Sequence, residues 1–207
     1  MKRVILFDFD YTLGDSTDGI VESISHALYK MNLPCPSRDA ITKTIGLSLA
    51  RTYEALTGEK EEKKIRTFEG YFQEKADEVM VSSAALYHGV PKLLETLHEK
   101  GIETGIVTTK YHRRIQEILT VNAVERLVDA IVGGDDVKRP KPDPEGILSL
   151  QERFDIPPKE MLYVGDSVVD AQAAQAAHVD FIAVLTGTST PEELRAYPCL
   201  HILRAVE

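Results

Sequence analysis

Two aspartates follow the most apolar run near the N-terminus, and they are the first residues that could do chemistry. In the segment VILFDFDYT, Asp8 and Asp10 stand two positions apart. Side chains at positions i and i+2 share one face of a strand, so both carboxylates can point the same way. A buried carboxylate is costly unless it is paired, hydrogen-bonded or bound to a metal, and neighbouring carboxylates repel each other. We therefore expect a cation beside them.

Three later segments also place reactive groups directly after apolar runs. In GIVTTK, the hydroxyl of Thr108 can donate to a phosphate oxygen, and we expect Thr109 beside it to contact the substrate. In KRPKPDP, Lys141 stands between two prolines that stiffen the segment, which makes it the best candidate for a fixed cation. In VGDSVVD, Asp166 and Asp170 lie four positions apart and can share a helix face.

Each of the four segments alone has a commoner interpretation, such as a solvated loop, a turn or a helix cap. Together they favour a shared site, because the carboxyl ends of parallel strands line one crevice of the sheet. Four carboxylates, one fixed lysine and one hydroxyl suit a site for Mg²⁺ and a phosphate group. Mg²⁺ prefers hard oxygen ligands, and carboxylates and substrate phosphate oxygens supply them. We therefore expect the cation beside the two N-terminal aspartates to be Mg²⁺.

The elements that must position these groups alternate along most of the chain. Helical patterns separate the later apolar runs, which predicts an α/β fold with a Rossmann-like parallel sheet flanked by helices. Several runs are almost uniformly apolar, as strands covered on both faces are. We expect strands at residues 3–8, 102–107, 130–132, 161–164, 181–185 and 199–203.

One region interrupts this alternation. Between the first aspartate pair and residue 102 the sequence shows no strand pattern, and helical patterns cover residues 15–33, 38–45, 48–57 and 59–79. We therefore expect an all-α domain at 15–80, inserted into a core domain formed by 1–14 and 81–207.

The composition is that of an ordinary soluble globular protein. The 207 residues are 43% hydrophobic and 28% charged, and no apolar run is long enough to span a bilayer. The net charge of −9 argues against nucleic acid as a partner, because such binding requires neutralisation of phosphates. The start does not resemble a signal peptide. We expect a cytoplasmic protein without a disulfide framework or a membrane partner, and the choice between monomer and homodimer stays open.

The order of the motifs DxDxT, strand-end Thr, Lys-Pro and GDxxxD resembles the haloacid dehalogenase-like hydrolase superfamily. The helical insertion after the first motif is similar to the small α-helical cap of its phosphoglycolate phosphatase and β-phosphoglucomutase-like subgroup. The resemblance implies that Asp8 is the nucleophile, which takes the phosphoryl group as an aspartyl-phosphate. It implies that Asp10 is the general acid and then the general base, and that its backbone carbonyl also binds Mg²⁺.

The remaining motifs receive roles from the same resemblance. Thr108 would hydrogen-bond the phosphoryl oxygens, and Lys141 would neutralise charge on the nucleophile and the phosphoryl group. Asp166 would bind Mg²⁺ together with Asp8, and Asp170 would support the metal shell. Haloacid dehalogenases lack the second aspartate of the first motif, so its presence here favours phosphate chemistry.

The resemblance implies a Mg²⁺-dependent phosphatase that acts on a small phosphorylated metabolite similar to phosphoglycolate. A pyrophosphatase and a sugar-phosphate mutase of the same superfamily remain alternatives. A member that binds phosphate or a partner without catalysis is a further alternative, which the intact motifs disfavour.

Two positions depart from the pattern of this family, and a third could contact the substrate. The residue after the second aspartate is usually Gly but is Tyr11 here, and the Ala-Gly that often follows the fourth motif is Ala177-His178. His adopts a left-handed conformation less readily than Gly. In the cap segment IGLSLART, Arg51 is the nearest cation and could hold a substrate carboxylate or second phosphate. A solvated helix arginine is an equally good interpretation.

Overall fold

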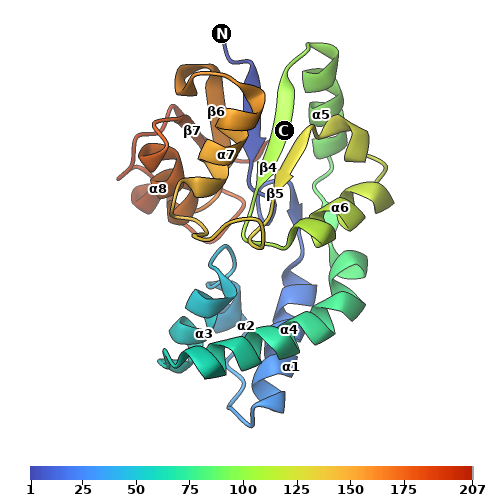
Figure 1. Ribbon diagram of the computed structural model, residues 1–207, viewed down its shortest axis with the longest axis vertical. Coiled ribbons are helices and arrows are strands. Elements are labelled where there is room, and N and C mark those ends of the chain that lie inside the picture. The colour runs from blue at the N-terminus through green and yellow to red at the C-terminus, as the bar shows by residue number, and fades with distance from the viewer. Residues whose placement is uncertain (207) are drawn as a thin grey trace. The chain divides into compact units, whose positions relative to one another are not determined.

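The computed structural model describes residues 1–206 and divides the chain into two units. Unit 1 contains Met1–Asp15 and the chain from Leu86 onward, and unit 2 contains Ser16–Ala85. The expected site residues belong to unit 1 except Arg51, which belongs to unit 2. Figure 1 shows the strands and helices of both units.

Unit 1 is built on a parallel sheet, as the sequence predicts. Within residues 1–206, six strands form one sheet in the order β5-β4-β1-β6-β7-β8, and their pairings are parallel. The strands are β1 (Val4–Phe7), β4 (Glu103–Val107), β5 (Ala130–Val132), β6 (Met161–Gly165), β7 (Asp180–Val184) and β8 (His201–Leu203). In chain order this arrangement reads 3-2-1-4-5-6, the order of a doubly wound α/β sheet whose direction reverses beside β1.

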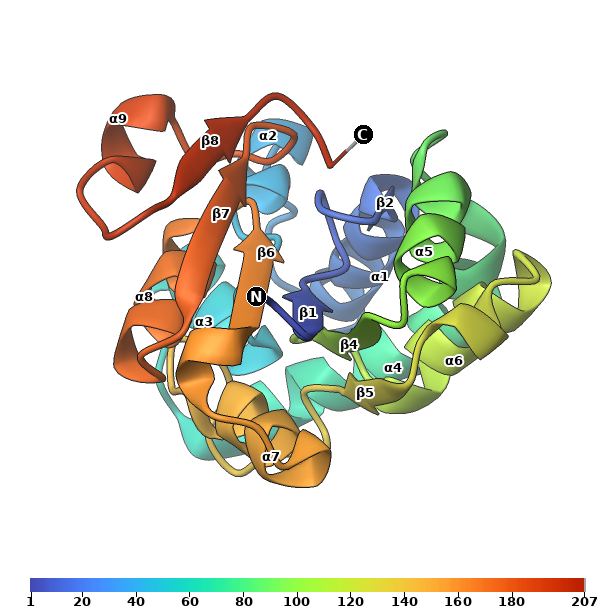
Figure 2. The same ribbon diagram turned by 90° about the horizontal axis from the view of Figure 1, so that it is seen from above.

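The central strands are apolar because helices cover the sheet on both sides. Every residue of β6 is buried, and β1 is buried except for the half-buried Ile5. Figure 2 shows α5 and α6 on one face of the sheet and α7 and α8 on the other. Complete burial of one such aliphatic side chain contributes about 1.5–3 kcal/mol. The covering helices are α5 (Val90–Glu99), α6 (His112–Val121), α7 (Glu145–Phe154) and α8 (Val168–Ala176).

The helix starts follow local sequence rules. Helix α5 has proline in its first turn and buries Val90, Leu94 and Leu97, the apolar face that its sequence indicates. A capping box at Thr190 and Glu193 starts α9 (Pro191–Leu194). The 3₁₀ turns η1 (Glu125–Leu127) and η2 (Pro158–Glu160) precede β5 and β6.

One prediction about the region before residue 102 is wrong. Two short strands, β2 (Gly14–Asp15) and β3 (Ala85–Leu86), form a separate two-stranded sheet there. A two-residue strand shows no alternation of apolar and polar residues, so the sequence pattern cannot reveal it.

Unit 2 consists of four helices, α1 (Thr17–Lys30), α2 (Arg38–Thr42), α3 (Leu49–Thr57) and α4 (Glu62–Ser83). Helix α1 packs along α4, and they approach closely at Gly19, where a Cβ would lie 2.1 Å from Ser83 Oγ. Helix α2 is shorter than expected. The backbone N–H groups of Thr44 and Ile45 donate to the carbonyls of Ile41 and Thr42, three residues back, so the chain continues after Thr42 in tighter turns and not as α-helix.

Candidate active site

The reversal of strand order places two of the expected carboxylates side by side. Strands β1 and β6 are neighbours on either side of the reversal. Asp8 directly follows β1, and Asp166 directly follows β6. The backbone N–H of Asp8 donates to the carbonyl of Val164 at 2.9 Å, which fixes the two strand ends together. Open parallel sheets bind ligands at this point, outside the carboxyl ends of the strands.

Asp8, Asp166 and Asp170 form a buried acidic cluster. Each offers one carboxylate oxygen, and these oxygens all lie within 4.8 Å of one another. The residues are 2%, 4% and 0% exposed. The structure therefore brings together three of the four carboxylates that the first and fourth motifs contribute.

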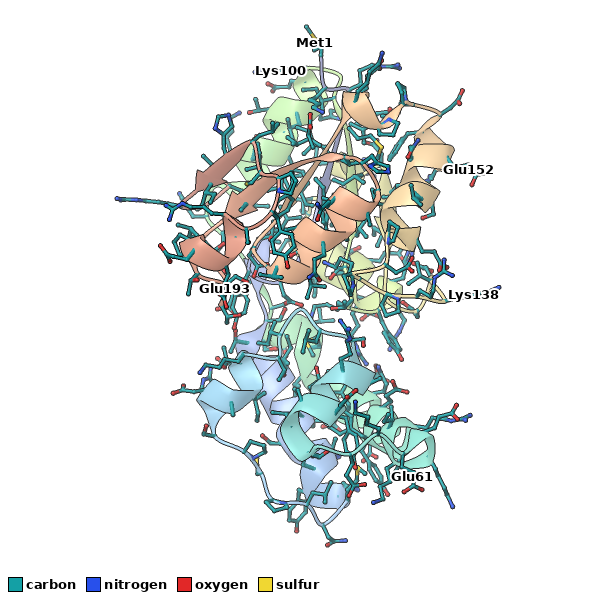
Figure 3. The ribbon with its side chains drawn as sticks, turned by 90° about the vertical axis from the view of Figure 1, so that its left-hand side faces the viewer. Met1, Glu61, Lys100, Lys138, Glu152 and Glu193 are labelled. Atoms are coloured by element: carbon teal, nitrogen blue, oxygen red, sulfur yellow. The ribbon has the colours of Figure 1, made fainter. Side chains whose placement is uncertain are left out.

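Lys141 is the cation inside this cluster. Its Nζ lies 2.9 Å from Asp8 Oδ1 and 2.5 Å from Asp170 Oδ1, and donates to the Tyr163 hydroxyl at 3.0 Å. Burial opposes its charged form, but the two aspartates outweigh burial and raise the pKa of Lys141 above its ordinary value. Lys138, three positions earlier, is exposed and projects from the surface (Figure 3). The proline-rich loop thus presents one particular lysine to the site.

Asp170 is surrounded by protein donors. Its Oδ1 lies 2.5 Å from Lys141 Nζ and 2.9 Å from the Tyr163 hydroxyl. Its Oδ2 accepts from the N–H of Ser167 at 3.1 Å and from its hydroxyl at 2.5 Å, completing a capping box that starts α8. These contacts favour an indirect contribution of Asp170 to a metal site, through Lys141 and the end of β6. Sequence reasoning missed Tyr163, because a tyrosine in an apolar strand looks like ordinary core.

Thr108 and Thr109 follow β4, the strand beside β1 on the other side. Thr108 is buried, and its hydroxyl accepts a hydrogen bond from the N–H of Lys110 at 3.3 Å. Thr109 is half-buried, and its carbonyl lies so close to Gly134 that a Cβ there would approach it to 2.4 Å. Both threonines therefore follow the carboxyl end of their strand, at the same end of the parallel sheet as Asp8.

A second buried lysine accompanies Asp10, and sequence reasoning did not identify it. Nζ of Lys110 lies 3.1 Å from Asp10 Oδ2, and the two side chains are 6% and 9% exposed. Lysine is rarely buried unless it is paired. The segment GIVTTK contains this residue, but a loop lysine gives no sign in the sequence that it turns inward.

The turn after Asp10 carries another contact to the metal-ligand candidates. Tyr11 has a positive φ of 60°, and its N–H donates to the carbonyl of Gly14 at 2.7 Å. This turn brings the hydroxyl of the buried Thr12 to Asp166, where it donates to Oδ1 at 3.2 Å. Glycine adopts this left-handed backbone without steric cost, which explains why the family that the sequence resembles usually has Gly at the position of Tyr11.

Residues 185–190, after β7, form a fifth segment at the site, which the sequence analysis did not single out. Gly187 approaches Asp166 so closely that a Cβ would lie 1.8 Å from Oδ2. The hydroxyl of Thr186 donates to the carbonyl of Tyr11. A loop rich in Gly, Thr and Ser reads as an ordinary turn, so only the structure reveals its contact with the carboxylates.

The acidic cluster carries uncompensated negative charge. Burial raises the pKa of Asp8 to about 6, Asp170 and Asp10 add to the rise, and Lys141 opposes it. Burial also raises the pKa of Asp166 well above its ordinary value, with further contributions from Asp170 and Asp8. Both shifts show that the protein alone does not stabilise the charged form of these carboxylates fully.

The residues present fit a divalent cation. Asp8 Oδ1 is buried and accepts no well-aligned hydrogen bond from residues 1–206, although Lys141 lies at ion-pair distance. Four carboxylates against two lysines leave two excess negative charges when all groups are ionised, which matches one divalent ion. The donors are hard oxygens, as Mg²⁺ requires. The four carboxylates are those of Asp8, Asp10, Asp166 and Asp170, and the two lysines are Lys110 and Lys141.

Arg51 lies outside this cluster, in unit 2. It is exposed near the start of α3, where its N–H donates to the hydroxyl of the N-cap residue Ser48 at 3.4 Å. Its expected contact with substrate stays a prediction.

Cys35 and Cys199 are free thiols. No helix within residues 1–206 has both the length and the apolar character needed to cross a membrane.

Comparisons with known proteins agree on one family. The family model described as haloacid dehalogenase-like hydrolase matches residues 5–184. Phosphoglycolate phosphatase of Salmonella typhimurium is 30% identical, over 93% of this chain and 84% of the relative. Pyrophosphatase PpaX of Bacillus velezensis is 33% identical, over 95% of this chain and 90% of the relative.

Solved structures give the same result. A protein from Bacteroides fragilis titled as a haloacid dehalogenase-like hydrolase aligns with a TM-score of 0.97 and 38% identity, covering 100% of this chain and 98% of that one. A predicted phosphoglycolate phosphatase from Haemophilus somnus aligns with a TM-score of 0.85 and 28% identity, covering 99% of this chain and 94% of that one.

Proposed function

This chain belongs to the haloacid dehalogenase-like hydrolase family, and from that premise we propose that it is a Mg²⁺-dependent phosphatase acting on a small phosphate monoester. The observation that carries the proposal is the ion pair of 2.9 Å between Asp8 and Lys141, beside Asp166 at the strand reversal. A nucleophilic carboxylate needs a nearby cation and an accessible phosphorus, and this position in the sheet suits both. Unit 1 is the catalytic core in this proposal, and unit 2 is the cap domain.

The first chemical step transfers the phosphoryl group to the enzyme. A carboxylate oxygen of Asp8 attacks phosphorus, and the bond between phosphorus and the ester oxygen breaks. The leaving oxygen takes the electron pair of that bond and a proton from the Asp10 carboxyl group. Lys141 and the Thr108 hydroxyl face the charge on the transferring oxygens, and stabilisation of this charge is the main requirement of phosphoryl transfer.

The second step releases phosphate. A water molecule attacks phosphorus of the aspartyl-phosphate and gives a proton to Asp10, and the bond between phosphorus and Asp8 breaks. Asp8 returns as a carboxylate paired with Lys141. The structure holds both lysine–aspartate pairs close to their ordinary contact distances, so Asp8 and Asp10 each have a defined partner when the cycle restarts.

A divalent ion held by Asp8, Asp166 and the backbone carbonyl of Asp10 would supply positive charge to the nucleophile and the phosphoryl oxygens. The protein's own contribution is to fix these groups. Thr12 orients Asp166, Gly187 makes room for it, and the contacts of Asp170 hold the end of β6.

The names of the relatives support a proposal for the substrate class. Several relatives are phosphoglycolate phosphatases by name, at 30% identity over 93% of this chain. We propose a small anionic monoester resembling phosphoglycolate, with Arg51 as a candidate contact for its carboxylate. The Bacillus velezensis relative is a pyrophosphatase by name and is slightly more similar in sequence, so inorganic pyrophosphate is the second candidate substrate.

The test is a screen of phosphate esters and pyrophosphate for Mg²⁺-dependent phosphate release. Phosphoglycolate should be among the better substrates, and EDTA should abolish release. Asp8→Asn removes the nucleophile at constant volume, so turnover should fall by at least about a thousandfold. Near-normal turnover by a folded Asp8→Asn protein would contradict the mechanism.

The screen also separates the alternatives. Preference for pyrophosphate over every ester would support the second candidate. Phosphate release from no compound, followed by interconversion of sugar-phosphate isomers, would identify a mutase instead. Binding of phosphate without any turnover would indicate a member that has lost catalysis.

A further inference from the structure

We propose that Lys110 is a positioning residue for Asp10: it holds the carboxyl group in the orientation that exchanges a proton with the leaving oxygen and then with water. The inference rests on the proposed function and adds a residue that the motifs of the sequence did not include. It is carried by the buried contact of 3.1 Å between Lys110 Nζ and Asp10 Oδ2.

The burial of Lys110 requires an explanation. Lysine has a long, strongly hydrated side chain, and an ammonium removed from water is costly unless an opposite charge compensates it. Its side chain is 6% exposed, and the carboxylate that compensates it is 9% exposed. Two groups this well shielded from water interact more strongly than a surface pair, because solvent does not screen them.

The backbone fixes the start of the Lys110 side chain. Its N–H donates to the Thr108 hydroxyl at 3.3 Å, and its carbonyl accepts from the N–H of Gly134 at 2.9 Å. The close approach of Gly134 to Thr109 holds the same loop from the other side. The ammonium therefore extends from an anchored point, which is what a positioning role requires.

The two buried lysines contact different carboxylates of the site. Lys141 contacts Asp8 and Asp170, and Lys110 contacts Asp10. The nucleophile and the acid–base group thus have separate cations. A group that must give a proton and later take one gains from fixed geometry, because proton transfer needs donor and acceptor within hydrogen-bond reach.

A positioning role through Asp10 makes a specific kinetic prediction. An alkyl phosphate needs a proton on its leaving oxygen, whereas an activated aryl phosphate such as p-nitrophenyl phosphate releases a stable anion. The value of kcat/KM covers the steps up to departure of the leaving group. Loss of Lys110 should therefore slow alkyl esters much more than activated aryl esters. A lysine that only binds the phosphoryl group would affect both classes equally.

The experiment measures kcat/KM of wild type, Lys110→Met, Asp10→Asn and the double variant with an alkyl and an activated aryl phosphate. We expect Lys110→Met to lower kcat/KM at least about tenfold for the alkyl ester and less than about threefold for the aryl ester. In the Asp10→Asn background, Lys110→Met should cost less than about twofold more, because residues that act through one another are not additive.

The controls address folding and general charge effects. Lys92→Met removes an exposed lysine of α5 and should leave kcat/KM unchanged for both the alkyl and the aryl phosphate. Thermal melting reports whether Lys110→Met folds, and Lys110→Gln, which keeps a polar end group, is the alternative if it does not. The Mg²⁺ concentration for half-maximal activity should stay within about twofold of wild type, because Lys110 contacts the carboxyl group of Asp10, whereas the metal ligand proposed for Asp10 is its backbone carbonyl.

Each outcome decides the inference. Equal losses for both ester classes, or full additivity with Asp10→Asn, would overturn the positioning role and leave the phosphatase proposal intact. An unchanged or faster variant would overturn it as well. Absence of turnover by the wild type with every ester would overturn the proposed function and this inference with it.

Discussion

At the scale of single residues, the two departures from the family pattern fall on the same backbone conformation. Tyr11 has a φ of 60° and His178 a φ of 56°, both in the left-handed region. Glycine occupies this region without a steric cost, which is why the family pattern has glycine there. His178 is exposed after α8, and Tyr11 is buried in the turn after Asp10.

His178→Gly should stabilise the protein. The left-handed conformation costs a non-glycine residue about 1–2 kcal/mol, and the greater freedom of glycine in the unfolded chain offsets about 0.4–1 kcal/mol of this gain. We expect the melting temperature to rise by about 1–4 °C in thermal unfolding. Ala176→Gly, at the exposed last residue of α8, is the matched control and should lower it. A lower melting temperature for His178→Gly would show that its side chain contributes more than the strain costs.

The individual site residues differ in how far their positions follow from sequence. Asp8, Asp166 and Lys141 stand next to apolar strands or between prolines, so pattern and chain stiffness indicate where they go. Lys110 and Gly187 could not be found this way, because their importance lies in contacts with distant residues. A lysine in a loop and a glycine in a turn look the same whether they are exposed or packed against a carboxylate.

At the scale of elements, the loop of residues 185–190 is the part that sequence reasoning missed most completely. The strands were predictable because covered strands are uniformly apolar, and most helices because of their periodic apolar faces. The loop has neither property. It reaches the site because β7 pairs beside β6, which brings Gly187 against Asp166 and Thr186 against the carbonyl of Tyr11.

Gly187→Ala should therefore disrupt the metal site while the fold persists. A Cβ would lie 1.8 Å from Asp166 Oδ2, so the carboxylate or the loop must move. Displacement of groups that orient a metal ligand typically costs tenfold to a hundredfold in metal affinity, and we expect about this loss in a Mg²⁺ titration followed by calorimetry.

The matched control for this prediction is Gly70→Ala. Gly70 lies in α4 with open space around its Cβ position, and alanine should stabilise the helix slightly without changing Mg²⁺ affinity. Unchanged Mg²⁺ affinity in Gly187→Ala would mean that Asp166 is not a metal ligand or that the loop yields without cost.

At the scale of the whole molecule, the acidic cluster links stability to pH and to the metal. A carboxyl group whose pKa is higher in the folded than in the unfolded state binds a proton more tightly on folding. Its contribution to stability is therefore lost as the pH rises from the unfolded value towards the folded one. Burial raises the pKa of Asp8 to about 6 from an ordinary value of 3.8, and Asp166 shifts in the same direction.

The metal-free protein should thus lose stability from this cluster as the pH rises from about 4 to above 6, by an amount on the order of a few kcal/mol. The Asp8→Asn variant cannot ionise at this position, so in EDTA it should be more stable than wild type at about pH 7.5 and show a smaller advantage at about pH 5.

Mg²⁺ stabilises the folded state by binding to it. The rise in melting temperature that Mg²⁺ produces should therefore be larger for wild type at about pH 7.5 than at about pH 5, where protons compete for the same oxygens. Thermal unfolding of both proteins with EDTA and with Mg²⁺ at the two pH values measures all of these differences. An Asp8→Asn advantage that does not change with pH, or an equal Mg²⁺ effect at both pH values, would show that this cluster does not control the stability of the folded protein.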